Sequence, residues 1–299
     1  MKIIDIKTDN LEERLKSEFD YLQDKYKTVA FNMYDWWGRP NNRSTGKNIL
    51  LAIEGYITIP NNYNPDVIRQ YDVFITHNSK FKSMHPELNI VLQNAPANWE
   101  NYYYLDEFLS YDEKIKGVVC LAKVYNTRAA GDINFMKNTV MVDLKVEPEL
   151  SVHTYGPASF GKPESYQGNL GYKHSHYVNL KKINEYLFCW CPEPMYHELW
   201  SHDYVTERLF NCFKSKTVAI YYGCYNIQDI IPTDLYIDYR NFKNTDELSK
   251  YLLEFYKDKD KYTKMVEDAY EWNKTCKLGD IQLLENIIQE CVDKYPIKK

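Results

Sequence analysis

Short apolar runs that each end in polar residues constrain the fold of this chain more than any other feature. Residues 49–53 run into Glu54-Gly55, residues 71–76 run into His77-Asn78, and residues 186–191 are apolar throughout. Continuous apolar runs are typical of strands that are covered on both faces, as in a parallel sheet. The segments between the runs contain helical spacings, so the pattern predicts an α/β fold with largely parallel sheets.

The length of the chain predicts two domains. It has 299 residues, and domains usually contain roughly 100–200. An aromatic and acidic stretch at 103–112 separates two series of strands and predicts a linker or a bridging helix. We expect a first domain at 1–115 and a second at 116–299, with the last helix, at 280–295, packing back on the first.

Composition excludes several classes of protein. The net charge is −5, and a general nucleic-acid binder normally carries a basic excess. No stretch approaches the roughly 20 apolar residues of a membrane span, and residues 1–6 are too short for a secretory signal. The seven cysteines form no Cys-x-x-Cys pair, which favours buried thiols in a reducing compartment. We therefore expect a cytoplasmic protein that neither spans a membrane nor binds nucleic acid.

The ends of the predicted strands are the expected place for a ligand. In open α/β sheets, ligands bind beyond the carboxyl ends of the strands. This rule selects Glu54, His77, Gly156 and the turn at Tyr222-Gly223.

Residues 186–208 carry the strongest functional pattern and read YLFCWCPEPMYHELWSHDYVTER. An apolar strand leads through a polar loop to Asp203, a good N-cap, and a helix is predicted from Tyr204 to residue 215. A helix N-terminus attracts anions, Arg208 adds a cation there, and Glu207 adds oxygens that suit a ribose diol. The pattern indicates a nucleotide-diphosphate site, although spacing alone favours a solvated helix face for Glu207 and Arg208.

This region resembles the C-terminal domain of the α-1,3-fucosyltransferases, a GT-B family of inverting enzymes that use GDP-fucose. The similar segments are YLFCWCPEP, DYVTERLFNCF and VAIYYGCYNIQDIIPTDLYIDYRNF. The family's Tyr-Val-Thr-Glu-Lys block corresponds to Tyr204 to Arg208, with Arg in place of Lys. Its aromatic-Gly strand end corresponds to Tyr222-Gly223, and the similarity is dense over residues 150–265.

The resemblance implies a GT-B fold, with two Rossmann-like domains facing a central cleft. It implies an inverting glycosyltransferase that moves a sugar, fucose from GDP-fucose being the first expectation, to a hydroxyl of a glycan acceptor. Tyr204 and Glu207 would then lie near the ribose and Arg208 near the phosphates. Glu193 would contact the donor, and Glu54 takes the place of the glutamate proposed as the catalytic base.

Two departures from the family pattern leave alternatives open. The family's Asn after the strand-end Glu is Pro194 here, and the loop before Tyr204 is longer. A transferase for another nucleotide sugar, or a non-catalytic nucleotide- or glycan-binding relative, is therefore the alternative. The family also holds the pyrophosphate with an Arg, for which Lys137 is the expected counterpart and Arg128 the alternative.

No metal cofactor is expected. The resemblance implies that protein cations, rather than a metal ion, stabilise the departing GDP. The only Asp-x-Asp in the sequence is Asp258-Lys259-Asp260, and its Lys-rich surroundings favour a solvated helix face. The expected ligands are a GDP-sugar donor and a glycan acceptor.

Overall fold

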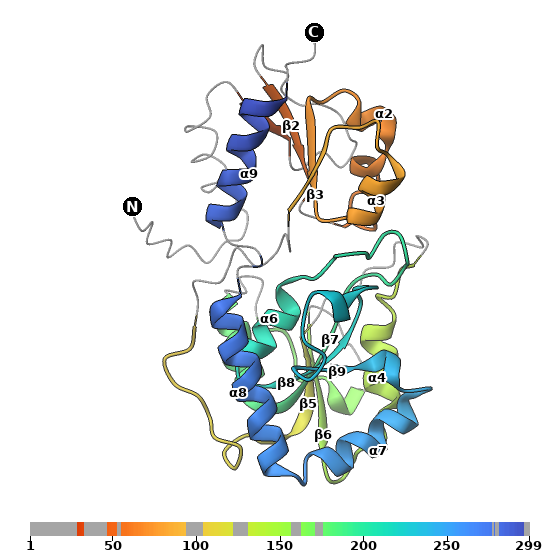
Figure 1. Ribbon diagram of the computed structural model, residues 1–299. Helices are drawn as coiled ribbons and strands as arrows, with labels where there is room; N and C mark the ends of the chain where they lie inside the picture. Colours follow the sequence, from red (N-terminus) through yellow and green to blue (C-terminus); the bar gives the residue numbers. More distant parts are fainter. Residues whose placement is uncertain are drawn as a thin grey trace.

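The computed structural model describes residues 29–32, 47–52, 55–93, 104–121, 131–156, 163–170, 176–276, 278 and 281–295. Within them lie two separate sheets, in which every strand pair is parallel, as the apolar runs predict (Figure 1). The first sheet has the order β1-β2-β3-β4 and consists of β1 (Val29–Asn32), β2 (Lys47–Leu51), β3 (Val73–Thr76) and β4 (Ile90–Leu92). The second has the order β6-β5-β7-β8-β9 and consists of β5 (Ile115–Leu121), β6 (Ser151–Tyr155), β7 (Tyr186–Pro192), β8 (Val218–Tyr222) and β9 (Ile237–Asp238).

Helices connect the strands. The α-helices are α2 (Pro65–Ile68), α3 (Ser79–Met84), α4 (Met136–Asp143), α5 (His176–Asn184), α6 (Glu207–Lys214), α7 (Thr245–Phe255), α8 (Lys259–Thr275) and α9 (Ile281–Lys294). The short 3-10 turns are η1 (Pro60–Tyr63), η2 (Pro163–Ser165), η3 (Ile227–Asp229) and η4 (Tyr239–Asn241). We call residues 29–93 the first half and residues 115–275 the second half.

Both faces of the first sheet are covered. Ile49 and Leu51 of β2 pack with Ile288 of α9, so the end of the chain returns to the first sheet. Leu50 points to the opposite face and shares a cluster with Phe81 of α3. This alternation follows from the two-residue period of a strand. Figure 1 shows the first sheet between α9 on one side and α2 and α3 on the other.

The second sheet is also covered on both faces, which explains why all seven residues of β7 are buried. Leu187, Phe188 and Trp190 share a cluster with residues of α4 and α7. Cys189 and Cys191 share the cluster on the other face with residues of α6, as the alternation predicts. The cysteines are free thiols, and Cys276 alone is partly exposed.

The strand order places a switch point in the second sheet. β6 lies on one side of β5, whereas β7, β8 and β9 lie on the other. The chain thus winds in opposite directions from β5, and the crevice beyond the carboxyl ends of β5 and β7 is where ligands bind in such sheets. β7 ends at Pro192, directly before Glu193.

Several local predictions differ from the structure or lie outside it. The sequence predicts a helix at residues 132–144, and the observed helix is shorter, because α4 spans Met136–Asp143. No helix forms over residues 104–112, where a bridging helix was one alternative. The sequence also predicts a short strand at residues 2–6 and, from its helical spacing, a helix at 10–27; both ranges lie outside the described residues. The domain boundary near 115 stays a prediction.

Candidate functional site

The first turn of α6 begins later than the sequence predicts. The prediction that Asp203 caps a helix starting at Tyr204 is wrong, because Asp203 has a left-handed backbone with φ of 60°. The helix starts at Glu207, and Thr206 is its N-cap: the Thr206 hydroxyl accepts a hydrogen bond from the backbone N–H of Arg208. Thr206 has the extended backbone that an N-cap residue requires.

Glu193 holds this cap in place. It follows β7 and is 0% exposed. Its Oε1 accepts the backbone N–H of Thr206 at 2.7 Å, and its Oε2 accepts the Thr206 hydroxyl, also at 2.7 Å. The Tyr221 hydroxyl donates to Oε1 at 3.3 Å. Burial raises the pKa of Glu193, and the charge of Arg208 acts in the opposite direction. Glu193 therefore fixes the start of α6, and its predicted contact with a donor stays a prediction.

Gly223 allows the close packing behind Glu193. A Cβ atom at Gly223 would lie 2.3 Å from Cγ and 2.4 Å from Cβ of Glu193, well inside van der Waals contact. Only glycine fits at this strand end without moving the carboxylate. Within the turn at Tyr222-Gly223, the missing side chain of Gly223 thus leaves room for the side chain of Glu193.

Arg208 is fixed beside the buried carboxylate. Its NH1 lies 3.3 Å from Oε2 of Glu193 and donates to the Thr206 hydroxyl at 3.0 Å. The Arg208 side chain is 30% exposed, whereas that of Glu193 is 0% exposed. Arg208 is thus not part of a fully solvated helix face, yet part of its side chain is exposed to solvent. Glu207, the first residue of α6, is half-buried.

Lys137 of α4 is a second cation near this carboxylate. It is 1% exposed, and its Nζ donates to Oδ1 of Asn134 at 2.6 Å. Burial and, to a smaller extent, the charge of Arg208 together lower the pKa of Lys137 to about 7, and the charge of Glu193 acts in the opposite direction. These effects require the three charges to lie close together. Arg128, the alternative to Lys137, lies outside the described residues.

The charge balance of this cluster suits an anion. Two cationic side chains, Arg208 and Lys137, accompany one buried carboxylate, Glu193. The N–H groups in the first turn of α6 add partial positive charge. A diphosphate placed there would accept hydrogen bonds from these N–H groups and from the two cationic side chains.

Tyr204 and His77 meet where the two halves touch. Tyr204 is buried, and its ring centroid lies 5.0 Å from that of His77, which directly follows β3. Burial lowers the pKa of His77 to about 4, so its ring is neutral at pH 7. Its Nδ1 is buried and has no hydrogen-bond partner among the described residues. Glu54 lies outside those residues, and the roles predicted for Tyr204 and Glu54 stay predictions.

Sequence reasoning missed Thr206 and Tyr221. A signal existed for Thr206, because threonine is a preferred N-cap residue and Glu207 is favourable in a first turn. No signal existed for Tyr221, since its contact with Glu193 depends on how two neighbouring strands align.

Two negative findings apply to the described part of the chain. None of its helices is long and apolar enough to cross a membrane. Nor do three or more His, Cys, Asp or Glu side chains gather there in a way that could hold a metal ion. In the Asp-x-Asp, Asp258 caps α8 by accepting the backbone N–H of Lys261 at 3.0 Å.

Comparison with known families gives a match over the whole of the second half and beyond. The family described as "Glycosyltransferase family 10 (fucosyltransferase) C-term" matches residues 114–292. The 4-galactosyl-N-acetylglucosaminide 3-alpha-L-fucosyltransferase 9 of Mus musculus is 30% identical over 133 residues, which are 44% of this chain and 32% of the relative. The match thus spans about a third of that relative's length.

Solved structures of similar fold cover nearly the whole chain. The crystal structure of an alpha1,3-fucosyltransferase with GDP has a TM-score of 0.57 at 14% identity and covers 96% of this chain and 88% of its own. The structure of TarM has a TM-score of 0.59 at 11% identity and covers 91% of this chain and 57% of its own. The α/β fold of the GT-B type is therefore confirmed.

Proposed function

Because the chain belongs to glycosyltransferase family 10, the fucosyltransferase family, we propose that it transfers fucose from GDP-fucose to a hydroxyl of a glycan acceptor with inversion. The single observation that carries this proposal is the fixed cluster at the start of α6. There Glu193 holds Thr206 and Arg208 at the switch point of the second sheet. The similarity to fucosyltransferases supports GDP-fucose as the donor.

The proposed donor site uses charge to bind the diphosphate. Arg208 contributes its partly exposed cationic side chain, Lys137 contributes a second cation, and the first turn of α6 contributes backbone N–H groups. Glu207 offers acceptor oxygens to the ribose, and Tyr204 closes the site toward the first half. Glu193 acts behind them as a positioning residue.

The proposed reaction is a single displacement. The acceptor oxygen forms a bond to the anomeric carbon while the bond from that carbon to the diphosphate oxygen breaks. The proton of the acceptor hydroxyl passes to the carboxylate of Glu54 as general base. The electron pair of the broken bond leaves with GDP, whose added charge Arg208 and Lys137 stabilise. We propose that no metal ion takes part, because these cations perform the neutralising role.

Titration calorimetry tests the donor. We expect GDP and GDP-fucose to bind in buffer with EDTA, and UDP-sugars to bind at least about tenfold more weakly, a difference of about 1.4 kcal/mol. Transfer of fucose to glycan acceptors should also proceed in the buffer that contains EDTA. Stronger binding of a UDP-sugar would support the alternative donor that Pro194 and the longer loop leave open. A strict need for Mn²⁺ or Mg²⁺ would contradict the metal-free mechanism.

Donor affinity should fall as the pH rises above 7. Lys137 has a pKa of about 7 because it is buried, so the free protein loses this cation between pH 7 and 8. A bound diphosphate favours the charged form and raises the pKa, so binding takes up a proton in this range. We expect GDP affinity to decrease by up to about tenfold per pH unit above 7, with proton uptake visible when calorimetry is repeated in buffers of different ionisation enthalpy.

The matched variant for this pH effect is Lys137→Arg, because an arginine stays charged throughout the range. The GDP affinity of this variant should hardly change between pH 7 and 8.5. Any remaining change would come from other titrating groups, which the variant and the wild-type protein share. An equal slope in the two proteins would show that Lys137 does not bind the diphosphate.

A further inference from the structure

The long connection between β7 and α6 reaches across to the first half. Within it, residues 195–205 form a segment that we call the clamp. The Trp200 ring stacks on Tyr56 of the first half, with centroids 3.9 Å apart and planes 8° from parallel. Leu199 and Trp200 also join the apolar cluster of the first half that includes Tyr63 and Phe81. The clamp therefore contributes to the core of the first half, although it belongs to the chain of the second.

A second apolar contact lies at the base of the clamp. Met195 and Tyr204 share a buried cluster with Ile57 of the first half. The approach is so close that a Cβ atom on Gly55 would lie 2.1 Å from Cε of Met195 and 3.1 Å from the Tyr204 ring. The chain thus has a glycine at a point where the two halves lie in close contact.

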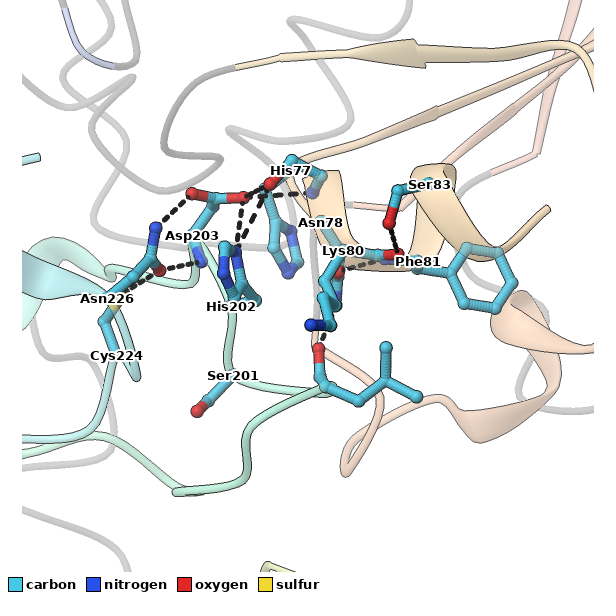
Figure 2. Close-up of polar contacts among 12 residues, drawn as sticks. His77, Asn78, Lys80, Phe81, Ser83, Ser201, His202, Asp203, Cys224 and Asn226 are labelled. Atoms are coloured by element: carbon cyan, nitrogen blue, oxygen red, sulfur yellow. Dashed lines mark hydrogen bonds and ion pairs between the residues drawn. The ribbon is translucent and has the colours of Figure 1, made fainter. Parts of the chain in front are cut away.

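Asp203 joins the halves through polar contacts. Its Oδ2 accepts the backbone N–H of Ser79 at 3.0 Å and also accepts the Ser79 hydroxyl. Its Oδ1 accepts Nδ2 of Asn226 at 2.8 Å, and its own N–H donates to Oδ1 of Asn226 at 2.8 Å. Figure 2 shows Asp203 between Asn226 of the second half and the start of α3. Burial raises the pKa of Asp203, but the hydrogen bonds from Asn226, Ser79 and His202 together lower it below its ordinary value, so the carboxylate is charged at pH 7.

Two further contacts cross the same boundary. Asn78 uses both ends of its amide, because Oδ1 accepts the Phe81 N–H within α3 while Nδ2 donates to the carbonyl of Leu199 at 2.7 Å. Lys80 lies 3.3 Å from Glu198, but both side chains are exposed and such pairs contribute little. The important polar contacts are therefore those of Asp203 and Asn78.

The clamp leads directly into the candidate donor site. It ends at Tyr204 and Val205, and the next residue, Thr206, is the N-cap that Glu193 holds. Glu193 anchors Thr206 on the second half, so these contacts at the start of α6 involve no residue of the first half. What the docked clamp adds is a fixed placement of this site relative to the first half.

We propose that the clamp holds the two halves in one working arrangement, with Asp203 and Trp200 as positioning residues. It aligns the donor site with acceptor-binding groups on the first half, and neither residue contacts the donor. The longer loop that separates this chain from the family pattern is thus a device that limits relative movement of the halves. Its effect on turnover rests on the proposed function, whereas its effect on the cohesion of the halves does not.

The test combines Ser79→Ala, which removes the hydroxyl's hydrogen bond to Asp203 and keeps that of the Ser79 backbone N–H, with Trp200→Ala, which removes the stacking on Tyr56. Both are changed together because either substitution alone leaves the other contact in place. Ser83→Ala is the matched control: Ser83 lies on the same short helix, and its hydroxyl donates to the carbonyl of Lys80 within α3. In the double variant we expect hydrogen exchange of residues 195–205 to increase at least about tenfold. Turnover should fall by roughly 10–10²-fold, as misplacement of reacting groups does, with GDP affinity within about threefold of wild type.

Each outcome decides the proposal. Exchange of residues 195–205 that matches the Ser83→Ala control would show that the clamp does not depend on these contacts. GDP affinity that falls as far as turnover would show that the loop acts locally on α6 and does not align two halves. If the double variant does not fold, the two single variants provide the same comparison at smaller amplitude. If the wild-type protein transfers no sugar, the proposed function fails, while the exchange measurement still tests the clamp.

Discussion

Glu54→Gln is expected to lower turnover by about 10²–10⁴-fold while GDP affinity and the melting temperature stay close to those of wild type. The reason is that a general base acts on the acceptor hydroxyl in the transition state and does not hold the nucleotide. Glutamine keeps the size of the side chain and removes the proton-accepting charge. Steady-state transfer assays, combined with GDP titration and thermal unfolding of the same preparation, measure the three quantities together.

The competing role for Glu54 predicts a different set of results. A glutamate before a glycine at the end of a strand can cap a turn, and its loss would then lower the melting temperature while the folded fraction keeps its turnover. A folded Gln variant that is active within a few-fold of wild type would therefore exclude Glu54 as the base. His77 would be the next group to replace, because its neutral ring carries a buried Nδ1 with no partner among the described residues. Its pKa of about 4 makes it a weak base, so we rank it second.

The fold was predictable because its signals are local. Continuous apolar runs such as residues 186–191 are typical of strands buried on both faces, as in parallel sheets that are covered by helices on each side. The alternation that placed Cys189 and Cys191 on one face needs nothing beyond the geometry of a strand. These properties belong to the segment itself and do not depend on distant parts of the chain.

The site was predictable only in part, because its details depend on distant contacts. The sequence analysis predicts Asp203 as the cap, whereas the structure uses Thr206, because Glu193 binds both the N–H and the hydroxyl of Thr206. The Asp203 carboxylate instead accepts a hydrogen bond from the backbone N–H of Ser79, which is far away in the sequence. The longer loop was visible as a departure from the family pattern, but its contact with the first half could not be read from its residues.

Arg208→Ala is expected to weaken GDP binding about tenfold or more, since the loss of a charged hydrogen bond costs about 1.5–3 kcal/mol. The same substitution should also reduce the free energy of unfolding, because it removes the cation beside the buried Glu193. We expect a loss of about 1–3 kcal/mol, below the cost for a fully buried pair, since the Arg208 side chain is 30% exposed. Lys216→Ala is the control for lost charge, because Lys216 pairs with Glu267 at 2.7 Å, beyond the other end of α6.

Adding Glu193→Gln to Arg208→Ala separates binding from folding. Without Arg208, the carboxylate of Glu193 is left buried with less compensation, and burial already raises its pKa. Glutamine removes that charge and can still accept the N–H of Thr206 through its carbonyl oxygen and donate to the Thr206 hydroxyl through its amide. The double variant should therefore be more stable than Arg208→Ala alone, while its GDP affinity stays as low. Stability and affinity that recover together would show that Arg208 supports the site only through the fold, whereas recovery of stability alone assigns the guanidinium to the diphosphate.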